Sequence, residues 1–260
     1  MYYHGENSSG GGSIGLAYSK DKVHWQKYSG NPVLSPSERY DSNWMGYPSV
    51  IFDSQVYKMW YTGRQIGGGN ISYTIDYATS KDGIHWTKYG GNPVVTGETG
   101  KIEKYVWAQQ PDVLKVDSKY FMLLQFGYNV ISYATSNDGL SWNTTGLPLM
   151  EWGNTSSWDY DVSFPSFLLS DTGLTLYYTG SQYNASGFSA IGVAYCNFVV
   201  LHTTATTTVT VTKNSFVTFT TTEQVPTPEP PVYQTIAAVL AVMVVVLCLV
   251  LLTARRRLRG

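Results

Sequence analysis

The chain has 260 residues, of which 43% are hydrophobic and only 13% are charged, and its formal net charge is −1. A nearly neutral chain without a basic patch excludes a protein that binds nucleic acid by neutralising its phosphates. The composition is also aromatic, with 21 tyrosines and 8 tryptophans, and its two cysteines are Cys196 and Cys248. We do not expect these to pair, because Cys248 lies in an apolar terminal segment.

One pattern of residues occurs four times between residues 1 and 197. Its clearest copy joins the aromatic stretch Tyr57–Gly63 to the segment Ile75–Trp86. The copies share an alanine, and these alanines are 61, 56 and 60 residues apart: Ala17, Ala78, Ala134 and Ala194. A fixed period of this kind indicates stacked or radially arranged structural units.

Each copy predicts four antiparallel strands. In the second copy we expect them at residues 48–52, 57–61, 71–79 and 85–89, with a glycine-rich loop over 62–70. The first is a short apolar run, and the second alternates aromatic and other side chains, as strands do. Four strands per unit is what a propeller blade requires, so we predict an all-β fold, a β-propeller of four-stranded blades over residues 1–200.

A turn of the form Ser-x-Asp-Gly-x-x-Trp joins the third and fourth expected strands, as at Ser80–Trp86. It resembles the Asp-box hairpin of sialidases, with one residue fewer between Asp and Gly. Its recurrence along the chain favours a packing role over a catalytic one. His24 and His85 belong to these turns, and nothing near them has metal-ligand spacing. We therefore expect neither a metal nor a cofactor.

The phase of the repeat places Met1 opposite Met59, in the middle of a second strand. The first copy then lacks its first strand, and the last copy shows no obvious fourth strand. Residues 1–30 contain no apolar stretch typical of an export signal. We hypothesise that the chain is an N-terminally shortened form of a longer protein, whose missing part holds a signal peptide and the first inner strand.

The C-terminal part changes character at about residue 201. Residues 201–234 are rich in threonine and proline, which is typical of an extended stalk. The alternating Thr-Val stretch within it is alternatively a strand that completes the last blade. Residues 235–253 are 19 uncharged residues, a length that predicts a transmembrane helix, and residues 254–260 carry four arginines. The positive-inside rule places that tail in the cytoplasm and the repeats outside the cell membrane.

Five Asn-x-Ser/Thr sequences agree with an exterior, glycosylated protein. They begin at Asn7, Asn70, Asn143, Asn154 and Asn184. In a chain this rich in serine and threonine, chance accounts for some of them, so they give mild support.

The repeated segments resemble a known group of proteins. Ile14–Asp21 with His24-Trp25, Asn31–Leu34, and Tyr57–Gly63 are similar to segments of the five-bladed propellers of the arabinanase, levansucrase and invertase superfamily. That superfamily includes glycoside hydrolase families 32, 43, 68 and 130. The resemblance covers residues 1–197 and implies a carbohydrate-directed protein whose sugar-binding funnel is lined by the first strand of each blade.

The resemblance also implies carboxylates just before the proline of each inner strand, since glycoside cleavage needs a pair of carboxyl groups. The corresponding positions hold no acidic residue. They are Gly46-Tyr47 before Pro48, Gln109-Gln110 before Pro111, and Ser163-Phe164 before Pro165. This departure puts hydrolysis in doubt.

Acidic and aromatic residues do occur nearby, in segments expected to line the funnel rim. We take as candidate catalytic carboxylates Asp41, Asp112 and Asp161. The candidate substrate-binding residues are Trp44, Trp107, Trp158, Asp159 and Glu103. Flat aromatic faces suit the apolar face of a sugar ring. The alternative is that the acids cap loops and the tryptophans fill gaps between blades.

Three hypotheses follow for the whole protein. The first is a membrane-anchored extracellular enzyme acting on glycosidic bonds, which requires Asp41, Asp112 and Asp161 to converge. The second is a non-catalytic glycan-binding or adhesion module with scattered acids. The third is a structural cell-envelope protein. Fold alone does not select among them.

Overall fold

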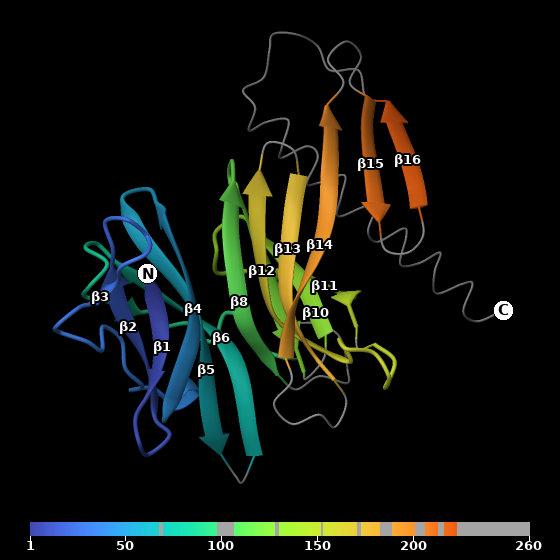
Figure 1. The fold of residues 1–260 in the computed structure, drawn as a ribbon. Helices are drawn as coiled ribbons and strands as arrows, with labels where there is room; N and C mark the ends of the chain where they lie inside the picture. The colour runs from blue at the N-terminus through green and yellow to red at the C-terminus, as the bar shows by residue number, and fades with distance from the viewer. Residues whose placement is uncertain are drawn as a thin grey trace.

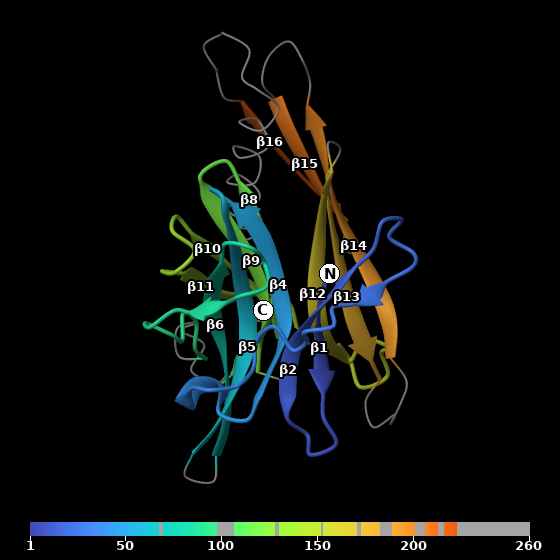
Figure 2. The ribbon, with the colours of Figure 1, turned by 90° about the vertical axis from the view of Figure 1, so that its left-hand side faces the viewer.

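The computed structural model describes residues 1–67, 70–97, 107–127, 130–151, 153–170, 173–182, 189–200, 206–212 and 216–222. These residues form four antiparallel sheets that follow one another in chain order (Figures 1 and 2). The short 3₁₀ turn η1 (Arg39–Asp41) is the one helical element in this part of the chain. The prediction of an all-β propeller fold is confirmed in its class, and no helix among the described residues is long and apolar enough to cross a membrane.

In each sheet the strands lie side by side in chain order. The first sheet contains β1 (Tyr2–Glu6), β2 (Gly12–Tyr18) and β3 (Gln26–Lys27). The second contains β4 (Trp44–Asp53), β5 (Val56–Gly67), β6 (Asn70–Ser80) and β7 (Thr87–Lys88). The third contains β8 (Ala108–Val116), β9 (Lys119–Phe126), β10 (Val130–Ser136) and β11 (Asn143–Met150). The fourth contains β12 (Asp161–Ser170), β13 (Gly173–Ser181), β14 (Ser189–Val200), β15 (Thr206–Thr212) and β16 (Phe216–Thr222).

The sheets match the sequence repeat, with two corrections. The glycine-rich stretch 62–70 is not a wide loop, because β5 and β6 continue as a paired ladder to Gly67 and Asn70. The last sheet does have a fourth strand: β15 pairs with β14, and β16 extends the sheet further. This is the second of the two interpretations of the Thr-Val stretch, and it follows from the β-propensity of alternating β-branched residues. Residues 223–234, 235–253 and 254–260 lie outside the described residues.

Successive sheets pack through their first strands. Strand β8 contacts β4, β5 and β6 of the sheet before it, and β12 contacts β8, β9 and β10 in the same way. Strand β4 contacts β1 and β2. The first strands β4, β8 and β12 thus form an inner layer against which the sheets turn. Between the sheets lies an apolar core that includes Trp60 and Met122, both fully buried.

The Asp-box-like turns latch neighbouring sheets together. In the second sheet, Ser80 Oγ accepts a hydrogen bond from the backbone N–H of Gly83, and Asp82 Oδ1 accepts one from the backbone N–H of His85. The turn then accepts a bond from the sheet before it, since Tyr2 donates its hydroxyl to the Gly83 carbonyl at 2.7 Å.

The next pair of sheets repeats the latch, with Trp60 Nε1 donating to the Gly139 carbonyl at 2.8 Å. These bonds give the turn a packing role, as its recurrence indicates. His85 takes part only through its own Asp82, at 2.7 Å.

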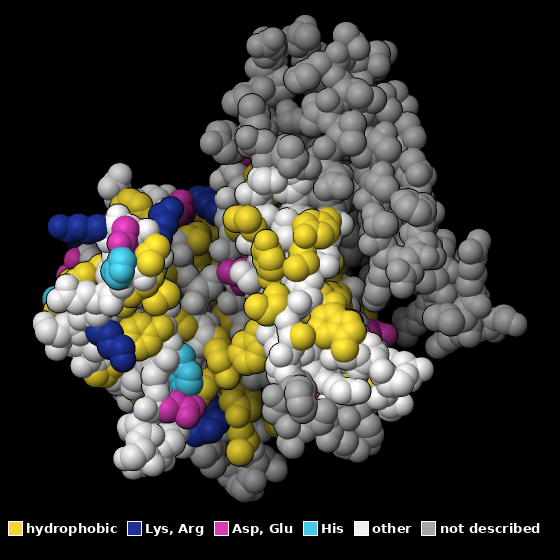
Figure 3. Space-filling model, in the orientation of Figure 1, with side chains coloured by type: hydrophobic (Ala, Val, Ile, Leu, Met, Phe, Trp, Pro, Cys, Tyr) yellow, Lys and Arg dark blue, Asp and Glu magenta, His cyan; other side chains and the backbone are white. Residues whose placement is uncertain are grey.

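The last sheet presents an apolar face to solvent. Figure 3 shows hydrophobic side chains gathered over β12, β13 and β14. The exposed members are Leu168, Tyr177, Ile191, Val193 and Tyr195. The opposite face of this sheet packs inward through Val162 and Tyr178.

Candidate functional site

The inner strands share one irregularity, immediately before their prolines. Tyr47, Gln110 and Phe164 have backbone φ angles of 52°, 56° and 49°. At each of them the ladder to the next strand shifts register, between Gly46 and Ser49 in β4 and at the equivalent places in β8 and β12. Bulky residues rarely adopt this left-handed conformation, and it is one that concentrates at functional sites. We call Tyr47, Gln110 and Phe164 the bulge residues.

The bulge residues contact one another across the sheets. The rings of Tyr47 and Phe164 meet edge to face, with centroids 5.3 Å apart and planes at 81°. The Phe164 amide donates to Oε1 of Gln110 at 2.6 Å. The backbone N–H of Gln110 in turn donates a hydrogen bond to the hydroxyl of Thr62, in the preceding sheet, at 2.8 Å. The three sheets therefore converge on these side chains, and Phe164 keeps 46% of its surface exposed.

More aromatic side chains surround Tyr47. His4 and Trp44 lie 5.7 Å and 5.3 Å from its ring, centroid to centroid. Burial lowers the pKa of His4, against the opposing effect of Glu6, and so favours the neutral imidazole. Burial likewise raises the pKa of Tyr47. The surroundings of the bulge residues are thus rich in ring faces, with the Glu6 carboxylate within hydrogen-bond distance of Trp44 at their edge.

The residues just after the prolines form a second, deeper layer. Asp112 Oδ1 accepts the Ser49 hydroxyl at 3.4 Å, and its Oδ2 accepts both the Ser166 hydroxyl and the Phe167 amide at 2.9 Å. The Val113 amide donates to Ser49 Oγ at 2.9 Å. Burial raises the pKa of Asp112, although these hydrogen bonds oppose the shift. Through these hydrogen bonds, Asp112 on β8 links the inner strands β4 and β12.

Asp41, a predicted catalytic residue, is fully buried away from this layer. Its Oδ2 accepts Lys88 Nζ at 2.5 Å and the Tyr61 hydroxyl at 3.3 Å. Its Oδ1 accepts the amides of Ser37 and Glu38. A fully buried carboxylate with every lone pair engaged stabilises its loop and offers no surface to a substrate.

Asp161 and Asp159 lie at the entry to the last sheet. Asp161 accepts the Ser181 hydroxyl at 3.4 Å. Asp159 accepts the hydroxyls of Ser157 and of Tyr178, the latter at 3.1 Å. The hydrogen bonds given for Asp41, Asp112 and Asp161 go to different residues. A catalytic role for Asp112 or Asp161 stays a prediction.

The three predicted tryptophans differ in exposure. Trp44 is 4% exposed and donates to Glu6 at 2.8 Å, so it fills the gap between the first two sheets. Trp107 is half-buried, donates to the Ile71 carbonyl at 2.9 Å and meets the ring of Tyr73. Trp158 is 46% exposed and stacks on Tyr178, with ring centroids 6.0 Å apart. Only Trp158 of the three keeps a large free face. Glu103 lies outside the described residues.

Comparison with known proteins decides the family. The model of the N-terminal domain of glycosyl hydrolases family 32 matches residues 2–159. The chain belongs to glycosyl hydrolase family 32.

Several known proteins are similar to it in sequence. An uncharacterized protein of Mycobacterium tuberculosis is 31% identical over 184 residues, which are 68% of this chain and 59% of that protein. An acid beta-fructofuranosidase of Vicia faba is 27% identical over 193 residues, covering 70% of this chain and 29% of the enzyme. This chain therefore spans less than two thirds of the length of these relatives.

Solved structures agree on the fold. A glycoside hydrolase superposes with a TM-score of 0.62 at 18% identity, covering 75% of this chain and 61% of that chain. A family 32 beta-fructofuranosidase of Bombyx mori in complex with sucrose superposes with a TM-score of 0.55 at 15% identity, covering 77% and 43%. At these identities the likeness concerns the fold alone.

This family 32 chain departs from the chemistry that the resemblance implies. The positions before the inner-strand prolines carry a phenol, an amide and a phenyl ring in place of carboxylates. Among the described residues no group of His, Cys, Asp or Glu side chains is arranged to hold a metal ion. What the bulge residues offer is ring faces and one amide, which suit contact with a neutral polar ligand.

Sequence reasoning located the bulge positions but assigned them no role. They were named only as places where carboxylates are missing. The sequence carries no signal for His4, because the first copy of the repeat is too short to show which of its strands faces the interior. The signal for the bulge residues is the recurring proline, which marks the same structural position in three strands.

Proposed function

We propose that this family 32 protein binds carbohydrate at the bulge residues and does not hydrolyse it there. The observation that carries the proposal is the composition of the bulge: Tyr47, Gln110 and Phe164 occupy the three equivalent positions and contact one another. An exposed ring such as that of Phe164 can stack on the apolar face of a sugar, and an amide can bond its hydroxyls. Without a carboxylate in these positions, the site lacks the proton donor and the nucleophile or base that cleavage requires.

The relatives indicate which sugars to test first. Two similar solved structures contain a bound sugar: sucrose in the family 32 enzyme of Bombyx mori, and 1-kestose in a fructan 1-exohydrolase of Cichorium intybus. We therefore propose fructose-containing oligosaccharides as the ligand class.

Hydrolysis is the second candidate, and Asp112 favours it. Its carboxyl lies one residue beyond Pro111, on an inner strand, and its pKa is raised by burial as a general acid requires. Against this, both of its oxygens are already engaged by Ser49, Ser166 and Phe167.

A glycan array on the full chain, followed by chromatography of the bound sugars, distinguishes binding without cleavage from hydrolysis. The proposal predicts retention of an oligosaccharide that is recovered intact, with retention unchanged in Asp112→Asn. Release of a monosaccharide by the unmodified chain, and its loss in Asp112→Asn, would establish the hydrolase instead.

We also propose that the propeller is displayed outside the cell on a membrane anchor. Support comes from the uncharged segment 235–253 and the arginines of residues 254–260. Asn7, Asn143 and Asn154 are exposed and so accessible to glycosylation. Protease added to intact cells should remove an N-terminal epitope and spare a C-terminal one. Protection of both epitopes would contradict the topology.

A further inference from the structure

A cluster of charged side chains joins the second and third sheets at the far ends of their inner strands. Lys58 Nζ of β5 donates to Oδ2 of Asp53, the last residue of β4, and Lys115 Nζ of β8 donates to Oδ1, each at 2.6 Å. The hydroxyl of Tyr120, on β9, also donates to Oδ2 at 2.6 Å. We call Asp53, Lys58, Lys115 and Tyr120 the lysine cluster. It lies about 13 to 17 Å along the strands from the prolines of β4 and β8, so it is separate from the bulge residues.

The lysine cluster holds two ammonium groups and a single carboxylate. The side chains of Lys58, Lys115 and Asp53 keep only 17%, 26% and 13% of their surface exposed. In the described part of the chain, each of the two lysines forms an ion pair with Asp53 and with no other acid. One positive charge is therefore left without a counter-charge in a largely covered place, where an unpaired ion is costly.

Asp53 and Lys58 both keep their charge. Burial alone would raise the pKa of Asp53, but the hydrogen bonds from Lys115, Lys58 and Tyr120 outweigh it and lower that pKa. Burial likewise opposes the charged form of Lys58, but the hydrogen bonds to Asp53 and Tyr120 raise its pKa. The excess positive charge is thus not relieved by a change of protonation at either residue.

The remaining N–H groups of the two lysines have no protein acceptor among the described residues. The Asp53 oxygens already accept four hydrogen bonds, the fourth from Ser54, and a carboxylate offers about four lone-pair sites. Lys58 also donates to the Tyr120 hydroxyl at 2.6 Å, which leaves it one N–H, while Lys115 has two. Both ammonium groups are held against the Tyr120 ring, 5.1 and 5.2 Å from its centroid. The donors are therefore fixed in place before any ligand arrives.

The repeat shows that the fold does not require these charges. The strand ladders place Val116 and Phe121 of the third sheet at the positions that Asp53 and Lys58 hold in the second. They place Leu169 of the fourth sheet at the position of Lys115. Apolar residues thus replace the cluster where the third sheet meets the fourth, in line with the small net stability that buried ion pairs provide.

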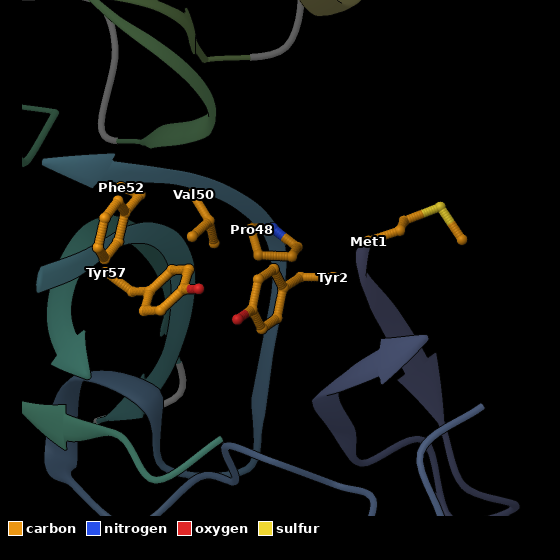
Figure 4. A pocket seen from close by; sticks show the side chains of 6 residues that line it. All are labelled: Met1, Tyr2, Pro48, Val50, Phe52 and Tyr57. Carbon is orange, nitrogen blue, oxygen red and sulfur yellow. The ribbon is translucent and has the colours of Figure 1, made fainter. Parts of the chain in front are cut away.

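The second sheet makes the same comparison for its own inner strand. The positions of Lys115 and Tyr120 are held there by Phe52 and Tyr57. Their rings lie side by side, with centroids 4.7 Å apart (Figure 4). Unlike the latch turns, the lysine cluster is therefore not part of the repeated scaffold, which favours a role in binding.

We propose that the lysine cluster is a binding site for a tetrahedral oxyanion, a phosphate or sulfate group. Oxygens of the anion accept the free N–H groups of Lys58 and Lys115, and its charge balances the excess ammonium. Hydrogen bonds between charged partners are stronger than neutral ones. Because Lys58 belongs to the second sheet and Lys115 to the third, the bound anion links β5 to β8 and stabilises their packing.

Thermal unfolding of the full chain in mild detergent tests the proposal, with inorganic phosphate added at constant ionic strength. We expect Tm to rise by about 3 to 6 °C at a phosphate concentration ten times Kd, and the rise to saturate. Chloride at the same ionic strength should not reproduce it. Phosphoserine carries the same group as a monoester, and saturable binding of either compound in calorimetry supports the site.

Variants locate the site. Lys115→Gln should weaken phosphate binding about tenfold, as loss of one charged hydrogen-bond donor implies. Lys20→Gln, at an exposed lysine of the first sheet's turn, is the matched control and should bind normally. A triple variant carries the residues of the equivalent places: Asp53→Val, Lys58→Phe and Lys115→Leu. It should fold, lose phosphate binding and show no phosphate-dependent rise in Tm, and it replaces Lys115→Gln if that variant fails to fold.

Three results would overturn the inference. The first is an equal rise of Tm in phosphate and in chloride. The second is the same phosphate affinity in Lys115→Gln as in Lys20→Gln. The third is a phosphate response that persists in the folded triple variant.

Discussion

The backbone amide of Phe164 donates to the side-chain carbonyl of Gln110 at 2.6 Å, joining two residues that stand at the same place in successive sheets. Each precedes a proline, and each has a left-handed backbone. The side-chain amide of Gln110 thus fixes the backbone of the bulge in β12. The resemblance to the propeller glycosidases implies carboxylates at these positions. The hydrogen bond makes the bulge a rigid surface of side chains.

Gln110→Ala should loosen that surface. The change leaves the Phe164 amide without its acceptor, and an unmet donor costs about 1 kcal/mol or more of unfolding free energy. Urea denaturation measures the loss. Gln109→Ala is the matched control, because the hydrogen bond from the Gln109 side chain to the Gly127 carbonyl is long, at 3.5 Å. Equal destabilisation by both changes would contradict the role given to Gln110.

The latch turns predict a pair of opposite effects. Gly83 and Gly139 have φ angles of 75° and 77°, and Lys22 holds the same place in the first turn with a φ of 62°. Lys22→Gly should stabilise the protein by about 0.5 kcal/mol, because the left-handed conformation costs non-glycine residues more.

Gly139→Ala should destabilise it by about 2 kcal/mol, because the new Cβ would lie 2.8 Å from Cζ2 of Trp60. Thermal unfolding compares the two variants. A shift of the same sign in both would show that these turns are not under backbone strain.

Asp41 and Asp76 predict a pH dependence of stability. Both are fully buried, and burial, with the negative charge of Asp41, raises the pKa of Asp76 well above its usual value. The native state therefore keeps a proton that the unfolded chain releases above about pH 4. This contribution to stability is present below that pH and is lost as the pH rises through the raised pKa of Asp76.

Asp76→Asn should remove this loss of stability, because the amide mimics the protonated carboxyl. Asp41→Asn should cost about 3 kcal/mol, since it leaves Lys88 buried beside an amide nitrogen. Urea denaturation from pH 4 to pH 8 measures both effects. A pH profile of Asp76→Asn that overlays that of the unmodified protein would refute the assignment.

The sequence predicted the blades well because their signals are local and repeated. The Asp-Gly turns, the aromatic second strands and the alanines of the third strands lie within one copy of the repeat. The wrong prediction at residues 62–67 and the two interpretations left open at β15 arose where composition is ambiguous. Gly63 and Gly67 lie in the paired ladder of a long hairpin, and threonine-rich sequence suits both a stalk and a strand.

The candidate site was harder to predict, because it depends on contacts between copies. Asp41 stands close to Pro48 in the sequence, yet it is fully buried against Lys88 of the same sheet. For Trp44 the sequence left open a sugar contact or a gap filled between blades, and the side chain is 4% exposed between two sheets. The meeting of Tyr47 with Phe164, 117 positions apart in the numbering, has no local signal.

The most direct test of the account is the affinity for 1-kestose of the unmodified chain and of Phe164→Asn, measured by calorimetry. Asparagine tolerates the left-handed backbone at this position but removes the ring. The account predicts binding by the unmodified chain with the sugar recovered intact, and about tenfold weaker binding by Phe164→Asn, as loss of one ring contact implies. Leu168→Asn, also an exposed position and four residues further along β12, should bind normally. Unweakened binding by Phe164→Asn, or cleavage of the sugar during the titration, would contradict it.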